Sequence, residues 1–125
     1  MSFNAILQEI VDGCAGTIAA ALMGNDGISI AEVAAAKPPA GEPLAEEVGT
    51  AGAEFGRILA DISKASDSLG GGLVQETTVV LARFTLIFRA VDDDTFVVVV
   101  LAPDGNLGKA RYLIRRQLLA LRLEL

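Results

Sequence analysis

Residue types that commonly carry catalysis are sparse in this chain. Its 125 residues include no histidine and one cysteine, Cys14. Without histidine there can be no Ser-His-Asp or Cys-His arrangement, no histidine-ligated metal and no imidazole base at neutral pH. One cysteine cannot build a zinc site. We therefore predict no catalytic residues, no metal, no cofactor and no enzymatic activity of the chain's own.

Two short motifs resemble ligand-binding sequences but lack residues that such sites need. Residues 92–94 (Asp-Asp-Asp) have neither the alternating spacing nor the closing glutamate of a calcium loop, which favours a solvated turn. Residues 108–109 (Gly-Lys) would end a phosphate-binding loop only with glycine at position 103 and serine or threonine at position 110. The chain has Pro103 and Ala110 there, so we do not expect it to bind nucleotide by itself.

Charge is unevenly distributed along the chain. The formal net charge of −6 argues against general nucleic-acid binding. Half of the ten basic residues nevertheless fall in the last predicted helix, namely Lys109, Arg111, Arg115, Arg116 and Arg122. They either stabilise the C-terminal end of the helix dipole and keep the surface soluble, or they contact an acidic partner surface.

Apolar residues of the same helix favour a partner. Tyr112, Leu119 and Leu123 project away from the predicted core side, which leaves apolar area exposed unless something covers it. Under this interpretation the residues that contact a partner are Arg111, Tyr112, Arg115 and Leu119.

Length and composition predict one domain, residues 1–125. The chain is 52% hydrophobic but only 5% aromatic, so its core must consist of Ala, Val, Leu and Ile. No apolar run approaches the ~20 residues that span a membrane, so we expect no membrane insertion. The N-terminus has no basic region typical of a secretory signal, and a single cysteine fits a reducing compartment. We therefore expect a cytoplasmic protein.

Hydrophobic periodicity predicts eight elements. They are a helix over residues 3–11 capped by Ser2, strands over 17–23 and 28–34, a helix over 43–69, strands over 73–81, 84–91 and 95–101, and a helix from about 107 to 121. An Asp-Gly turn joins the first two strands, a surface loop spans 37–43, and Asp104 or Asn106 can cap the last helix. The order α-β-β-α-β-β-β-α predicts an α+β fold, an antiparallel sheet with helices on its faces.

The long helix over residues 43–69 divides into three faces. Its predicted core stripe is Leu44, Val48, Ala51, Phe55, Ile58, Ile62 and Leu69. A second face is charged, and the third consists of small residues, namely Ala45, Gly49, Gly52, Gly56, Ala60 and Ser63. Each interior glycine costs roughly 0.5–1 kcal/mol relative to alanine, so this face needs an explanation. Either a second copy of the chain approaches there, or the glycines clear bulky side chains of the same domain.

Three stretches together resemble the Roadblock/dynein light chain domain family. They are GTIAAALMGNDGISIAEV (residues 16–33), the long small-residue helix with its three closing glycines, and VVVVLAPDGNLGKARYLIRRQ (residues 97–117). The resemblance covers essentially the whole chain. It implies a five-stranded antiparallel sheet of the Roadblock and profilin type, with the long helix on one face and the two terminal helices on the other.

The resemblance also implies a homodimer formed through the second helix and the third strand. The interface residues would be Ala45, Gly49, Gly52 and Gly56 of the helix and Gln75, Thr77 and Val79 of the strand. On this basis Gly52→Leu is expected to convert a dimer into monomer or aggregate.

Two functions follow from the resemblance. Prokaryotic members of MglB type bind Ras-like small GTPases and can accelerate GTP hydrolysis without inserting an arginine, which implies a homodimeric regulator or co-activator with no catalytic arginine. Eukaryotic members include dynein subunits and scaffold subunits, which implies the alternative of a structural adaptor that binds independently of nucleotide.

Overall fold

A computed structural model describes residues 1–36 and 45–125 of the chain. Its elements are α1 (Phe3–Gly13), β1 (Thr17–Gly24), β2 (Ser29–Ala34), α2 (Ala45–Leu69), β3 (Glu76–Val80), β4 (Thr85–Ala90), β5 (Thr95–Leu101) and α3 (Leu107–Glu124). The expected order and the α+β fold are confirmed. The predicted loop over 37–43 and the predicted start of the second helix lie outside the described residues.

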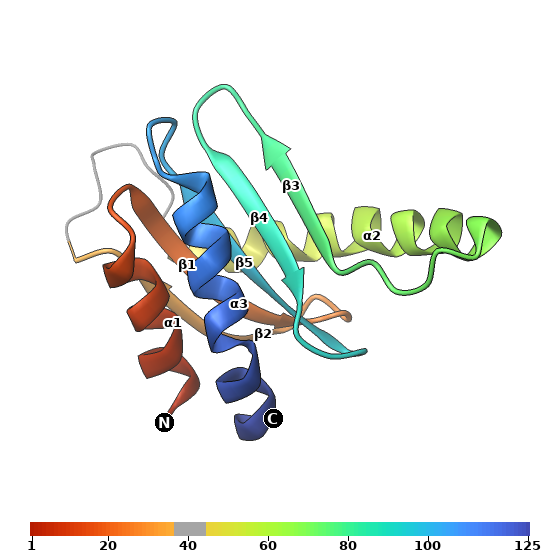
Figure 1. Cartoon of the computed structure of the whole chain (residues 1–125), viewed down its shortest axis with the longest axis horizontal. Helices are drawn as coiled ribbons and strands as arrows, with labels where there is room; N and C mark the ends of the chain where they lie inside the picture. The colour runs from red at the N-terminus through yellow and green to blue at the C-terminus, as the bar shows by residue number, and fades with distance from the viewer. Residues whose placement is uncertain (37–44) are drawn as a thin grey trace.

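The five strands form one antiparallel sheet in the order β2-β1-β5-β4-β3. All seven residues of β5 are buried, as expected for an uninterrupted β-branched run in the centre of a sheet. Helices α1 and α3 lie side by side on one face and α2 crosses the other (Figure 1). The sheet therefore separates two apolar layers.

The side chains of β5 point alternately into the two apolar layers. Val97, Val99 and Leu101 belong to the cluster under α1 and α3. The neighbouring residues Val98 and Val100 belong to the cluster on the α2 side. This period of two is the geometry of a strand with both faces covered.

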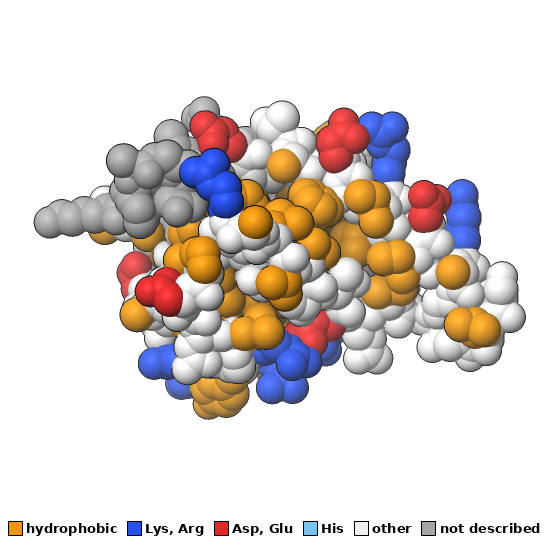
Figure 2. Space-filling view, turned by 90° about the horizontal axis from the view of Figure 1, so that it is seen from above, with side chains coloured by type: hydrophobic (Ala, Val, Ile, Leu, Met, Phe, Trp, Pro, Cys, Tyr) orange, Lys and Arg blue, Asp and Glu red, His pale blue; other side chains and the backbone are white. Residues whose placement is uncertain are grey.

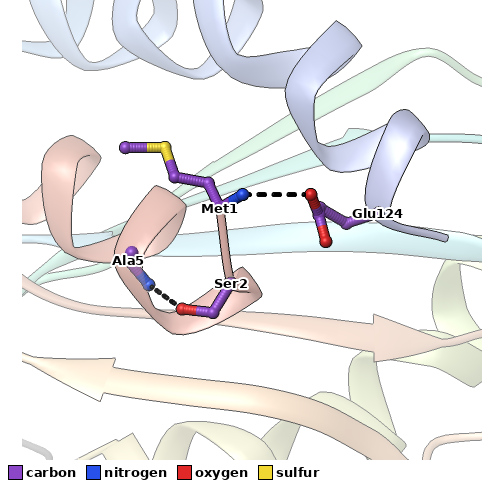
Figure 3. A network of polar contacts seen from close by, with 4 residues as sticks. All are labelled: Met1, Ser2, Ala5 and Glu124. Carbon is purple, nitrogen blue, oxygen red and sulfur yellow. Dashed lines mark hydrogen bonds and ion pairs between the residues drawn. The ribbon is translucent and has the colours of Figure 1, made fainter.

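Local side-chain contacts fix the ends of the two packed helices. The Ser2 hydroxyl accepts a hydrogen bond from the Ala5 amide at 3.1 Å, and the Asn106 side chain accepts one from the Lys109 amide at 3.0 Å. Asn106 is thus the cap of α3. The Met1 ammonium group lies 3.2 Å from the Glu124 carboxylate, which joins the start of α1 to the end of α3 (Figure 3).

The third strand is shorter than predicted. The sequence favoured residues 73–81, whereas β3 runs from Glu76 to Val80. The chain leaves α2 through Gly70 and Gly72, which have φ of +66° and +81°. Because this glycine segment reverses the chain, residues 73–74 approach the sheet before hydrogen bonding to β4 begins at Gln75 (Figure 1).

Asp92 organises the turn between β4 and β5. Its Oδ1 accepts hydrogen bonds from the amides of Asp94 and Thr95 at 2.9 and 2.8 Å, and from the Thr95 hydroxyl at 2.7 Å. The hydroxyl bond is the main cause that lowers the pKa of Asp92 below its ordinary value of 3.8. This arrangement agrees with the predicted turn.

Replacing Asp92 by asparagine tests this turn through its pH dependence. Because the folded-state pKa is lowered, the carboxylate stabilises the fold above pH 3.8, and this contribution is lost as the pH falls through the folded pKa. We expect Asp92→Asn to reduce the free energy of unfolding by about 1 kcal/mol near neutral pH, a modest value because the carboxylate is exposed. Urea denaturation should show the difference shrinking in acid, while Asp93→Asn has little effect. A difference that does not change with pH would contradict this account.

Candidate interaction surfaces

The inner face of α2 is made of small residues that lie on the sheet of their own chain. A Cβ built on Gly52 would overlap the sulfur of Met23, and one built on Gly49 would lie 2.7 Å from the carboxylate carbon of Glu32. Both glycines are buried. Met23 belongs to β1 and Glu32 to β2, the two strands on which α2 mainly packs. The glycines therefore allow close contact between helix and sheet.

This placement corrects the predicted role of the glycines at a dimer interface. Gly49, Gly52 and Gly56 are buried against their own chain, so the intrachain alternative is the one that the structure supports. The physical reason is the side chain of Met23, which occupies the space that any residue larger than glycine would need at position 52. The side chain of Ala45, the fourth predicted residue, lies outside the described side chains.

The outer face of α2 carries apolar residues that the sequence had placed in the core. Val48 is buried and Phe55 half-buried, as predicted. Ala51 is exposed, and Ile58 and Ile62 are 53% and 38% exposed. Leu69 is exposed at the end of the helix, and Leu44 is not described. The predicted core stripe therefore included residues that lie on the exposed outer face of α2.

An apolar hollow of about 160 Å³ lies between α2 and strands β4 and β5, next to the turn that joins β3 to β4. Its lining consists of Glu47, Val48, Ala51, Gly52, Phe55, Leu81, Phe84, Leu86, Phe88, Val98 and Val100. Seen from above, hydrophobic side chains gather across the middle of the molecule, with most charged side chains around its outline (Figure 2). The hollow indicates that α2 covers the apolar face of the sheet incompletely.

Strand β3 forms one edge of this same region. Among the described residues it pairs with β4 alone. The Ala90 amide donates to the Gln75 carbonyl at 2.9 Å, and the Leu81 amide donates to the Phe84 carbonyl at 2.9 Å. These two bonds and the register assign the odd-numbered residues of β3 to hydrogen-bonded pairs with β4.

The backbone groups of Glu76, Thr78 and Val80 therefore point outward from the sheet. The predicted edge residues Gln75, Thr77 and Val79 turn their backbone groups toward β4 instead. The Val79 side chain packs with the apolar cluster under α2. Sequence reasoning found the strand but could not determine which alternate residues hydrogen-bond inward.

Most of the α3 residues predicted to contact a partner are exposed. Tyr112 and Leu119 are 54% and 64% exposed, and Arg115 is also exposed. Leu123, at 76%, extends the same outer side of the helix, and Arg116 is exposed beside it. Arg111, by contrast, is partly buried and points to β3.

Arg111 is held by Glu76. Its Nε and Nη2 donate to one carboxylate oxygen of Glu76 at 2.9 and 2.5 Å, and this hydrogen bonding raises the pKa of Arg111. The Glu76 side chain is mostly buried. Arg111 therefore joins α3 to the edge strand, so its predicted role in partner contact is not supported by this geometry.

Neither a metal-binding group of side chains nor a membrane-spanning helix is found among the described residues. They contain no group of three or more His, Cys, Asp or Glu side chains arranged to hold a metal ion. No helix in this part of the chain has the length and apolar character needed to cross a bilayer.

Comparison with known proteins gives a clear result only for solved structures. No protein-family model and no curated protein sequence matches the chain. MglC from Myxococcus xanthus is 31% identical, with 100% of both chains covered and a TM-score of 0.70.

Two further structures share the fold at lower identity. A Roadblock/LC7 domain from Streptomyces avermitilis is 16% identical, with 98% of this chain and 96% of that chain covered and a TM-score of 0.81. The gliding protein MglB from Thermus thermophilus is 21% identical, with 91% and 81% covered and a TM-score of 0.79. The expected resemblance and the fold, which profilin also has, are confirmed.

Proposed function

The chain belongs to the Roadblock/LC7 domain family, and from this premise we propose that it forms a homodimer that binds a Ras-like small GTPase and modulates its GTP cycle. In this proposal residues 1–125 act as one cytoplasmic domain without an active site of their own.

The observation that carries the dimer is the adjacency of three features on one side of the molecule. The outer face of α2 exposes Ile58 and Ile62, the apolar hollow lies beside it, and β3 is the neighbouring sheet edge. An open edge beside apolar surface favours association with another chain. A second copy related by a two-fold axis would pair β3 with β3 and lay its α2 over the hollow.

The GTPase part of the proposal rests on the family resemblance. A regulator of this kind shifts a nucleotide cycle only by binding one state more tightly than the other. We propose that the dimer binds the GTP-bound state and stabilises the arrangement of the GTPase's own catalytic groups. No arginine of this chain is assigned a catalytic role.

Affinity capture with defined nucleotides tests this function. Immobilised protein is incubated with lysate of the source organism in a non-hydrolysable GTP analogue or in GDP, and bound proteins are identified by mass spectrometry. We expect a Ras-like GTPase enriched with the analogue, and the purified GTPase should hydrolyse GTP faster when the dimer is added. The absence of any GTPase in both nucleotides would contradict the proposal.

Equal capture in both nucleotides would favour the structural adaptor instead. One observation supports this second candidate: exposed apolar and basic residues of α3 lie on the opposite face of the sheet from α2. A dimer with a further binding face on each copy could join several proteins.

A further inference from the structure

We propose that the outer side of α3 binds an acidic amphipathic helix of a partner protein, an interaction separate from the dimer and from the GTPase. The binding surface, here called the α3 stripe, consists of Tyr112, Arg115, Arg116, Leu119 and Leu123.

The spacing of the α3 stripe suits a helical partner. Tyr112, Arg116, Leu119 and Leu123 follow the steps +4, +3 and +4, so they form one line along the helix. The buried side of α3 carries Ala110, Ile114, Leu118 and Leu121. At 1.5 Å per residue the line is about 16 Å long, or three turns of a docked helix. Two helices pack through ridges of this kind.

The unpaired cations of the α3 stripe determine which charge its partner must carry. Arg111 is paired with Glu76, and the Arg122 side chain donates to the Val91 carbonyl at 2.5 Å. Within the described part of the chain, Arg115 and Arg116 have no such partner and are exposed. Two free guanidinium groups beside apolar side chains favour carboxylates, which they can bind through paired hydrogen bonds.

The surroundings of the stripe favour a narrow partner over a membrane. Glu9 of α1 accepts a hydrogen bond from Gln117 of α3 at 2.9 Å, and Glu124 lies at the end of the stripe. An anionic bilayer would extend over Glu9, whose hydrogen-bond partner Gln117 is neutral, and would be repelled by this carboxylate, whereas Glu124 is paired with the Met1 ammonium group. A helix is only about 10–12 Å wide, so it can contact the stripe alone.

The α3 stripe and the proposed dimer face lie on opposite sides of the sheet (Figure 1). Both can therefore be occupied together, and a test of one does not depend on the other. Failure of dimerisation or of GTPase binding would leave this inference standing.

Fluorescence polarisation with a designed peptide tests the inference. The probe is a labelled, stapled helix of about 20 residues with leucines at the spacing of the stripe and glutamates on both flanks. We expect saturable binding that weakens as salt rises, and at least about a tenfold loss of affinity in Arg115→Glu/Arg116→Glu, because two exposed cations are reversed.

Three controls make the result specific. The same peptide with lysines in place of the glutamates should bind at least about tenfold more weakly. Arg57→Glu, a single charge reversal at an exposed position of α2, should retain binding of the acidic peptide. Circular dichroism should show unchanged folding of the double variant, since both arginines are exposed.

Several outcomes would overturn the inference. These are no saturable binding of the acidic peptide, equal binding of both peptides, or equal binding by the wild type and the double variant. Binding to phosphatidylserine vesicles without binding to the acidic peptide would identify a membrane surface instead.

Discussion

Gly52→Leu is expected to destabilise the monomer fold by about 3 kcal/mol or more, rather than only to separate a dimer. Even a single added carbon would overlap Met23, whose side chain is fully buried. Overpacking of a filled site typically costs about 1–3 kcal/mol, and leucine adds far more than one methylene. Urea or thermal denaturation should show the loss in the free energy of unfolding, and soluble yield should fall.

Two alanine variants separate packing from helix propensity. Gly56→Ala should stabilise the protein by about 0.5–1 kcal/mol, because the nearest atom to its new Cβ is 4.0 Å away and alanine favours the helix. Gly52→Ala should destabilise it, and the loss should shrink in a Met23→Ala background, where the obstructing side chain is gone. A Gly52→Leu variant that keeps wild-type stability but loses dimerisation would instead mean that Gly52 faces a second copy.

Thr78→Pro is expected to weaken the homodimer while the monomer stays folded. The Thr78 amide points away from β4, so proline removes a donor that no described strand of the same chain uses. Losing this donor and the flat edge around it should weaken dimerisation by about tenfold or more. Sedimentation across a concentration series measures the change.

The matched controls lie at the same edge. Thr78→Val keeps the amide and a similar shape, so the dimer should persist. Val79→Pro removes a bond within the β3–β4 pair and should therefore lower stability as well. If Thr78→Pro remains as dimeric as the wild type, β3 does not form the interface.

The order and type of the helices and strands could be predicted from local sequence patterns. The β-branched run at 97–101 predicted a buried central strand, and period-3.6 apolar residues predicted α1 and α3 with the correct buried sides. These elements are predictable because each buries its largest apolar side chains. The exposed positions of Tyr112 and Leu119 followed from the same projection.

Helix α2 shows where this reasoning fails. The rule that large apolar residues face the core placed Ile58 and Ile62 inward, whereas both are exposed, and it left the role of the glycine face open. The sheet under α2 is already filled by Met23, so the small residues face it and the isoleucines face out. Which side of a helix packs on a sheet depends on the size of the sheet's side chains at that place. The sequence of the helix alone does not give that size.

Which residues of β3 hydrogen-bond to β4 could likewise not be predicted from the sequence. Alternation of side chains identifies two faces of a strand, but it does not identify which backbone groups pair with the neighbouring strand. The register between β3 and β4 determines that Thr78, and not Thr77, presents its amide at the edge. The candidate dimer edge therefore required the structure.

The most direct test of the proposed dimer is the molar mass of the wild-type protein in solution, measured by multi-angle light scattering over a range of concentrations. We expect twice the chain mass of 13.0 kDa in the wild type and a lower mass, closer to that of a single chain, in Thr78→Pro at the same concentrations. A wild-type mass of 13.0 kDa at every concentration would contradict the homodimer, and with it the role assigned to the outer face of α2 and the edge of β3.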